Sequence, residues 1–302
     1  MPTKFKTPYG LQKPPLKYVL QWKLGSLFKS KRAKSKDDDF KLTVRALEAK
    51  DLERKEDFIV WLGHATFLIQ LNGVRILTDP VFGSIPMVKR LSKLPIAIEH
   101  LKPDVICISH GHYDHLDMAS LQALDIYSKK TKIIMPSKLS SYLKQGADVT
   151  ELAWYDETTE HGIRFTALPA SHWHRRGVFD FNRALWCSFL IETEGKSIFF
   201  AGDTAMDTHF EQIASKGYKI DTALMPIGAY LPQSVMQQSH MNPQEGLKGA
   251  EILGAKEMIP YHYGTFNLSD EPIGEPHSWI TRLAKESEID IKILDAGEIL
   301  CK

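Results

Sequence analysis

Cysteine is scarce in the sequence, and its placement offers no disulfide framework. The 302 residues include three cysteines, Cys107, Cys187 and Cys301, which are scattered singly and form no Cys-x-x-Cys pair. Disulfide-held proteins carry more cysteines and fold in oxidising compartments. We therefore expect a protein of the reducing cytoplasm.

Long apolar runs are missing too. No stretch approaches the roughly 18 apolar residues that a membrane span needs. The first ten residues are polar and are interrupted by Pro2 and Pro8, so they predict no secretory signal. The composition, with 43% hydrophobic and 25% charged residues, is that of an ordinary globular protein. These absences argue against an integral membrane protein and a secreted one.

Acidic residues are absent from the first 36 positions, which contain ten Lys or Arg. The remaining chain has 28 basic and 37 acidic residues, so the net charge of +1 hides a basic arm on an acidic body. Apolar residues follow a helical spacing from Leu16 to Phe28. The pattern predicts, over residues 1–50, a basic arm with an amphipathic helix that attaches peripherally to an anionic membrane surface. The alternative is a helix packed on the body, with its lysines in solvent.

Histidine, in contrast, is concentrated at one point. The apolar run Val105–Ile108 predicts a buried strand, and it is followed by Ser109-His110-Gly111-His112-Tyr113-Asp114-His115. Three histidines and an aspartate within six positions are an improbable accident in a chain with 12 histidines. Imidazole and carboxylate together suit zinc and related divalent ions. The stretch therefore predicts a metal-binding loop at the end of a strand.

Strand-like and helix-like segments alternate through the rest of the chain. The clearest hairpin covers Phe67–Leu77, where Asn72-Gly73 predicts a tight turn. Further strands are predicted near residues 132–135, 164–168, 187–192, 197–200, 222–225, 257–260 and 291–294, and helices near 118–127, 137–144, 243–253 and 277–285. The segments form two groups on either side of about residue 185, joined by short turns only. We therefore expect residues 51–302 to form one domain.

Three later strands also end in a side chain that can bind a metal: His172, Asp203 and His262. If these ends meet the histidine-rich loop, five imidazoles and two carboxylates converge, which is too many for one tetrahedral ion. The hypothesis is a pair of Zn²⁺ ions, with other divalent metals such as Mn or Fe also compatible. The proposed ligands are His110, His112 and His172 for one ion, Asp114, His115 and His262 for the other, and Asp203 as the bridge. Two such ions can hold a hydroxide nucleophile between them.

This set of residues resembles the metallo-β-lactamase superfamily, whose members carry His-x-His-x-Asp-His, a distal His, a bridging Asp and a final His. Within it, several stretches are similar to the family of N-acylphosphatidylethanolamine-hydrolysing phospholipases D, over about residues 15–280. They are Trp61–Thr66, Thr78–Phe82, Ser109–Asp117, Phe199–Thr204, Pro226–Tyr230, His240–Pro243 and His262–Phe266. The resemblance implies an α/β fold, the four-layer αβ/βα sandwich, with the metals at one edge between two sheets.

The resemblance also implies a phosphodiesterase that cleaves N-acylphosphatidylethanolamine-like phospholipids. It places His240 beside the metals as a catalytic residue, and we assign Asp114 to catalysis as well. A pKa near neutrality would let His240 protonate a leaving group. A lactonase of the same superfamily is the alternative function. A nucleic-acid substrate is disfavoured, because no RNA-clamping insertion is visible, and a homodimer is left open.

Several other residues allow two interpretations. His64 either orients a metal ligand or stabilises a turn, and Asp117 can contact a ligand histidine, cap the next helix, or do both. Asp79 is expected to support a metal ligand. Trp173, Arg175 and Arg176 are expected at the substrate entrance, with the arginines near phosphate. We expect His174 not to bind a metal, and the remaining histidines at the surface: His100, His161, His209 and His277.

Overall fold

The structure, a computed structural model, describes residues 4–6, 35–129 and 131–302. The helix predicted between Leu16 and Phe28 lies outside the described residues. No helix in the described part of the chain is long and apolar enough to cross a membrane.

The first of two seven-stranded sheets is built mainly from the N-terminal half of the chain. Its strands lie in the order β14-β1-β2-β3-β4-β5-β6. Their bounds are β1 Phe58–Gly63, β2 Thr66–Leu71, β3 Val74–Thr78, β4 Val105–Cys107, β5 Lys132–Pro136, β6 Asp148–Leu152 and β14 Ile299–Cys301. The predicted hairpin is β2–β3, and β4 lies parallel between β3 and β5. The strand that leads to the histidine-rich loop is therefore central and buried.

The second sheet takes the rest of the chain, in the order β13-β12-β11-β10-β9-β8-β7. Its bounds are β7 Glu157–Glu160, β8 Ile163–Leu168, β9 Ser188–Thr193, β10 Lys196–Phe200, β11 Thr222–Pro226, β12 Glu257–Tyr261 and β13 Asp290–Ile291. The predicted division near residue 185 is wrong, because the chain changes sheets between β6 and β7. The polar edge strands β6 and β7 carry almost no apolar alternation, so the sequence pattern did not reveal them.

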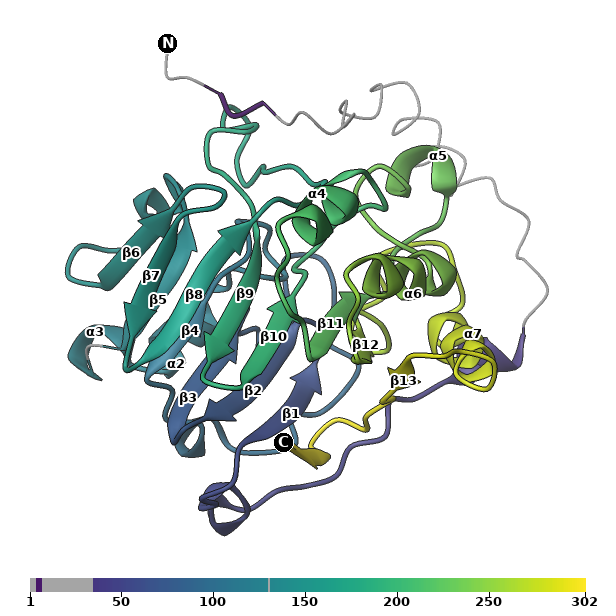
Figure 1. Ribbon diagram of the computed structural model, residues 1–302, viewed down its shortest axis with the longest axis horizontal. Helices are drawn as coiled ribbons and strands as arrows, with labels where there is room; N and C mark the ends of the chain where they lie inside the picture. Colours follow the sequence, from purple (N-terminus) through teal and green to yellow (C-terminus); the bar gives the residue numbers. More distant parts are fainter. Residues whose placement is uncertain (1–3, 7–34, 130) are drawn as a thin grey trace.

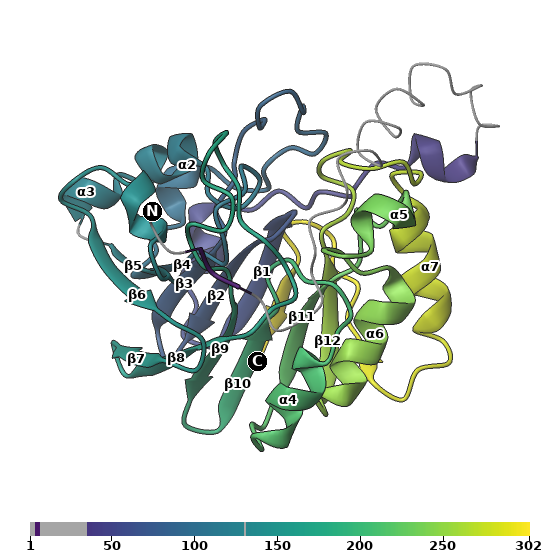
Figure 2. The same cartoon turned by 90° about the horizontal axis from the view of Figure 1, so that it is seen from above.

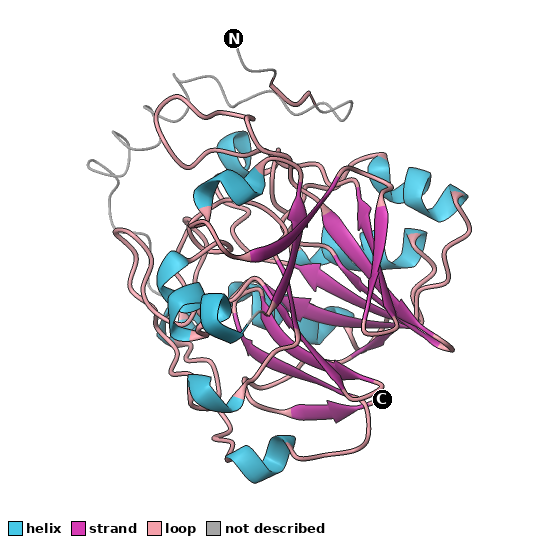
Figure 3. Cartoon of the chain, turned by 90° about the vertical axis from the view of Figure 1, so that its left-hand side faces the viewer, coloured by secondary structure: helices cyan, strands magenta, loops and turns pink. Residues whose placement is uncertain are grey.

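Helices cover the outer faces of both sheets, and the apolar core lies between the sheets and under each helical layer (Figures 1 and 2). The helices are α2 Met118–Ala123, α3 Ile126–Lys129, α4 His209–Ser215, α5 Gln233–Met236, α6 Pro243–Ile252 and α7 Glu275–Leu283, with short 3-10 turns at Lys36–Asp39, Ala49–Leu52, Ile98–His100 and Leu139–Tyr142. Figure 3 shows the two sheets stacked with helices outside them. The predicted four-layer αβ/βα sandwich is confirmed.

Helix boundaries follow local chemistry. At α6, Asn242 accepts a hydrogen bond from Glu245 N while Glu245 accepts one from Asn242 N, and Pro243 occupies the first turn. This capping box confirms the predicted start. The single helix predicted over residues 118–127 is divided into α2 and α3, because Asp125 has a positive φ of 56°. The helix predicted over 137–144 is only the 3-10 turn Leu139–Tyr142.

Part of the predicted arm packs on the body. Asp37 accepts hydrogen bonds from Gly274 N, 2.9 Å, and from Ser278 Oγ, 2.6 Å, at the start of α7. Arg45 N donates to Ala296 O over 2.7 Å. At the other end of the arm, Phe5 N donates to Asn182 O. Residues 35–50 of the arm predicted over 1–50 are thus in contact with the body, and the division into two domains stays a prediction.

Candidate metal centre

The histidine-rich loop is held in place by the buried carboxylate of Asp79. Asp79 accepts hydrogen bonds from Ser109 N, 2.7 Å, and from Ser109 Oγ. Gly111 is required inside the loop, since a Cβ there would lie 2.2 Å from Cε1 of His174. The loop therefore leaves the end of β4 in one conformation, with its side chains aimed at the edge between the two sheets.

Three histidines form the first group of candidate ligands. His112 Nδ1 lies 2.9 Å from His110 Nε2 and 3.1 Å from His172 Nε2. His172 follows β8, so this group joins the histidine-rich loop of the first sheet to the second sheet. The three nitrogen atoms all lie within 4.8 Å of one another, and together they could hold a metal ion.

A second group combines Asp114, His115 and His262 around Asp203. Asp203 Oδ2 lies 3.1 Å from His115 Nε2, and Asp203 Oδ1 lies 3.1 Å from His262 Nε2. Asp114 Oδ2 lies 3.6 Å and 3.9 Å from the same two nitrogens. Asp203 Oδ2 is also 4.0 Å from His110 Nε2 in the first group. The structure thus brings together all seven predicted ligands, with Asp203 placed between the two groups.

The spacing of these atoms fits two ligands of one metal ion. His115 Nε2, His262 Nε2 and Asp203 Oδ1 are buried and have no hydrogen-bond partner among the described residues. Two ligands about 2.0–2.1 Å from one tetrahedral zinc stand roughly 3.3 Å apart. The contacts of 3.1 Å from Asp203 to His115 and His262 agree with that separation.

Neighbouring acceptors fix which ring nitrogen faces the centre. His115 Nδ1 lies 2.6 Å from Asp79 Oδ2, and His172 Nδ1 lies 3.0 Å from Ser239 O. When each Nδ1 carries the proton, each Nε2 presents a lone pair toward the centre. Asp79 therefore orients a candidate ligand, which is the role that the sequence predicts for it.

Burial controls the protonation of the first group. It lowers the pKa of His112 to about 3 and the pKa of His110 and His172 well below the usual histidine value. Burial acts in the same direction on His115, but the carboxylates of Asp203 and Asp114 outweigh it and raise the pKa of His115. The first group therefore consists of neutral imidazoles, the form that binds a metal.

His64 belongs to this centre rather than to an isolated turn. Its Nε2 lies 3.1 Å from Asp114 Oδ2, and its side chain is buried. Its backbone is also fixed, since Thr265 Oγ1 accepts from His64 N over 2.8 Å and Trp61 Nε1 donates to His64 O. Both predicted roles are present together. Asp117 instead caps α2, where it accepts from Ser120 N and Oγ.

His240 stands beside the centre, on the segment between α5 and α6. Its Nδ1 is 3.7 Å from Asp203 Oδ2, and its ring centroid is 5.6 Å from that of His172. By distance it could also join Asp203 and His262 as a ligand. Burial lowers the pKa of His240 to about 4, against the opposing charge of Asp203. The expectation of a pKa near neutrality is therefore wrong, and the ring is neutral at neutral pH.

Three of the other residues differ from expectation or gain a role. The guanidinium of Arg176 is bonded within the protein instead of facing a phosphate site: its Nη1 donates to Gly111 O, 3.0 Å, and to Leu116 O, 2.7 Å. His174 faces Tyr142, with its Nε2 3.0 Å from the phenol oxygen. His209 was predicted at the surface but is fully buried in α4. The clamp made by Arg176 could not be foreseen, since nothing in the pattern Arg175-Arg176 distinguishes a structural arginine from a binding one.

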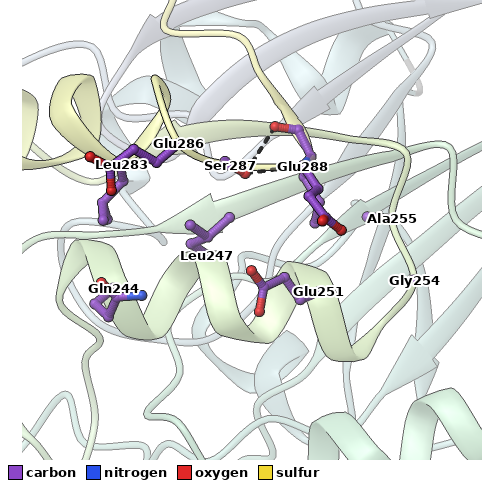
Figure 4. A pocket seen from close by; sticks show the side chains of 10 residues that line it. Gln244, Leu247, Glu251, Gly254, Ala255, Leu283, Glu286, Ser287 and Glu288 are labelled. Carbon is purple, nitrogen blue, oxygen red and sulfur yellow. Dashed lines mark hydrogen bonds between the residues drawn. The ribbon is translucent and has the colours of Figure 1, made fainter.

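A wide cleft of the surface lies away from this centre. A cleft of about 640 Å³ lies between α6 and the segment after α7, lined by residues such as Leu247, Glu251 and Glu288 (Figure 4). None of its lining residues belongs to the candidate centre. We place the chemistry by the convergent side chains, because the residues that line this cleft include no histidine and form no group that could hold a metal ion.

Comparison with known proteins shows the family of the chain. The family model described as "Beta-lactamase superfamily domain" matches residues 74–263. The chain is 34% identical over 287 residues to N-acyl-phosphatidylethanolamine-hydrolyzing phospholipase D 1 of Caenorhabditis elegans, covering 86% of this chain and 80% of that protein. It is 29% identical over 245 residues to a UPF0173 metal-dependent hydrolase of Thermococcus kodakarensis, covering 80% and 98% respectively. The solved structure of Igni18, a metallo hydrolase of Ignicoccus hospitalis, has a TM-score of 0.63 at 21% identity, covering 81% of this chain and 97% of that one.

Proposed function

We propose a specific activity for this chain from the fact that it belongs to the metallo-β-lactamase superfamily and is a metal-dependent hydrolase. The activity is that of a dinuclear zinc phosphodiesterase of phospholipase D type, acting on N-acylphosphatidylethanolamine-like phospholipids. The observation that carries it is the position of Asp203, which contacts His115 and His262 and also faces His110. The likeness to the nematode phospholipase D supports the choice of substrate.

In the proposed centre, His110, His112 and His172 would hold one ion, Asp114, His115 and His262 would hold the other, and Asp203 would serve both. Bound there, two zinc ions would supply a hydroxide at neutral pH and neutralise charge on the phosphoryl oxygens. The reaction adds the elements of water across a P–O bond of the phosphodiester. It releases phosphatidic acid and an N-acylethanolamine.

The residues of the chain divide the remaining work. Asp79 and Ser239 O hold the rings of His115 and His172 in the orientation that a ligand needs. His64 orients the carboxylate of Asp114, which faces the space where the hydroxide nucleophile would be held. His240 is neutral, so its N–H can donate to a phosphoryl oxygen, or its free nitrogen can accept a proton.

The proposed partner is an anionic membrane surface on the cytoplasmic side, and its support is the charge of residues 1–36. Since Asp37 hydrogen-bonds to the start of α7, removal of residues 1–34 takes away nine of the ten basic residues and leaves residues 35–50 on the body. The truncated protein should keep turnover of a soluble phosphodiester and lose salt-sensitive binding to anionic vesicles. Unchanged vesicle binding would contradict this role of the arm.

A direct comparison of substrates tests the proposed activity. Purified protein is given a fluorogenic phosphodiester, N-acylphosphatidylethanolamine in mixed micelles and a homoserine lactone, each with and without a chelator. The proposal predicts chelator-sensitive release of N-acylethanolamine and phosphatidic acid. Turnover of the lactone alone would favour the lactonase alternative and overturn the proposal.

A further inference from the structure

Two loops beside the candidate centre end in large apolar side chains that face solvent. Met87 is fully exposed on the loop after β3, and Val178 and Phe179 are 71% and 82% exposed on the loop after β8. Most of the other large apolar residues in the described chain are buried or half-buried. Such exposed side chains in a soluble fold commonly mark an interaction surface.

The tip at Met87 is a built feature rather than a loose loop. Ile85 and Val88 exchange two backbone hydrogen bonds of 3.0 Å, which makes a two-residue turn of Pro86 and Met87. Met87 has a φ of 66°, at a position where such turns favour Gly or Asn. A bulky apolar residue there costs stability and gains no packing. The position is therefore explained better by what Met87 contacts outside the protein.

This hairpin is fixed to segments of the candidate centre. Arg90 donates to Leu62 O, 2.8 Å, and to Val81 O, 2.7 Å, while Leu91 N donates to Thr265 O. Leu62 lies two residues before His64, and Thr265 lies three residues after His262. Ile85 also packs with Val81 and Phe266 in a small apolar cluster.

The tip at Phe179 is fixed in a similar way, and its turn is bonded to the histidine-rich loop. Asp180 accepts from Gly177 N, 2.7 Å, and from Tyr142 OH, 2.6 Å, which shapes the turn. Arg176 ties the same turn to Gly111 O and Leu116 O. Both tips therefore project from rigid supports at the edge where the candidate ligands gather.

The charges of the two loops indicate which kind of surface the tips would contact. Residues 81–93 contain Lys89, Arg90 and Lys93 and no acid. Residues 173–183 contain three arginines and one acid, Asp180, whose carboxylate is engaged within the turn. Arg90 and Arg176 are bonded to backbone carbonyls, which leaves Lys89, Lys93 and Arg183 as the exposed cations of the two loops. Apolar tips flanked by such cations fit a bilayer that contains anionic phospholipids, where the tips enter the acyl region and the cations meet the headgroups.

We propose that Met87 and Phe179 are the tips of two docking loops that seat the edge of this protein on an anionic phospholipid bilayer. The two contacts act in addition to the basic arm, because separate weak attachments multiply in affinity when they engage one surface. The purpose of this docking rests on the proposed function, since docking would bring the candidate centre to a phospholipid substrate. The binding itself is measured without turnover.

The test uses the full chain and vesicles of phosphatidylcholine with phosphatidylglycerol, with bound protein measured by co-sedimentation. Met87→Asn keeps the turn, since Asn accepts a positive φ, and removes the apolar tip. Phe179→Ser removes the other. Each variant should weaken vesicle binding about tenfold, and the double variant about a hundredfold. His161→Asn is the matched control: it also places Asn at a positive φ, 51°, at the exposed turn between β7 and β8 on the opposite edge, and should bind as the unchanged protein does.

Two results would overturn the proposal. One is a double variant that binds vesicles as tightly as the unchanged protein. The other is a double variant whose sedimentation velocity in the absence of lipid shows a changed number of subunits, which would mean that the tips join copies of the chain. Failure of the proposed function appears differently: vesicle binding would depend on both tips while no phosphodiester is cleaved.

Discussion

The two halves of the candidate centre hold their histidines in opposite electrostatic surroundings. His110, His112 and His172 face one another, with Asp203 Oδ2 4.0 Å from His110 Nε2, and burial keeps their pKa values low. His115 lies between the carboxylates of Asp203, Asp114 and Asp79, which raise its pKa. The histidines of the first half are already neutral and can bind a metal cation directly. In the second half, His115 must release a proton when a cation binds.

The difference explains why Asp203 is central to both halves. It offers negative charge to the first group, which has no carboxylate of its own, and it balances the cationic form of His115 in the second. A residue with both tasks should be the one whose loss disturbs the two halves equally.

Asp203→Ala is expected to have the largest effect. It removes the carboxylate between the groups, so both metals should be lost from the purified protein. Loss of metal assistance, worth several kcal/mol, should lower turnover roughly 10³-fold or more. Metal analysis and kinetics measure the two effects, with Asp221→Ala, at the opposite ends of the strands, as the control. Retention of one metal at full occupancy would show that Asp203 serves only one half.

His240→Ala should come next, with turnover lowered roughly 10²-fold. His240 stands beside both halves but is assigned to the reaction, so the metal content should stay unchanged. His240→Asn restores a hydrogen-bond donor and should recover part of the turnover. If metal content falls in step with activity, His240 is a ligand and the assignment is wrong.

Asp79→Asn should lower the metal affinity of one half of the centre more than that of the other. The variant keeps the size of the side chain but weakens the acceptor of His115 Nδ1, which lies 2.6 Å away. Loss of such a supporting group typically costs about 10–100-fold in metal affinity. Competition with a chromogenic chelator should show one weakened metal and one that is nearly unchanged. Equal weakening of both would mean that Asp79 acts through Ser109 on the whole loop.

The smallest expected effect is the pH dependence of the free energy of unfolding of the metal-free protein. Histidines with lowered pKa values, including His64 and His112 at about 3 and His240 at about 4, stay neutral when folded but bind protons when unfolded below about pH 6.5. Each therefore lowers the free energy of unfolding as pH falls through that value, by up to about 1.4 kcal/mol per pH unit.

His115 has the opposite sign: its raised pKa contributes stability that is present below about pH 6.5 and is lost as pH rises through the folded value. Because one histidine opposes several, urea unfolding of the metal-free chain should show lower stability at pH 5.5 than at pH 7.5. Equal or greater stability at pH 5.5 would contradict the burial of neutral imidazoles.

The sequence was sufficient to locate the centre but not to describe how it is held. Each predicted ligand follows an apolar run, and the ends of such strands meet at one edge of the fold, so the convergence of His110, His172 and His262 could be expected. The clamp of Arg176 on Gly111 depends on a loop conformation that no local pattern encodes. The same is true of His209, whose burial follows from the packing of α4.

The edge strands of the two sheets could not be predicted from the sequence either. β6 and β7 lie where one face meets solvent, and their mixed polar sequences carry no strand signal, so the change of sheet was placed about 30 residues too late. The protonation of His240 was also beyond the sequence, because its pKa is set by burial against residues from three distant segments.

The count of metal ions in an active preparation tests the central claim most directly. Protein purified without added chelator is analysed by inductively coupled plasma mass spectrometry, and turnover is followed as metal is removed and restored. The dinuclear account predicts two zinc equivalents per chain, with activity restored only when the second equivalent is added. Full activity with one tightly bound metal per chain would contradict it.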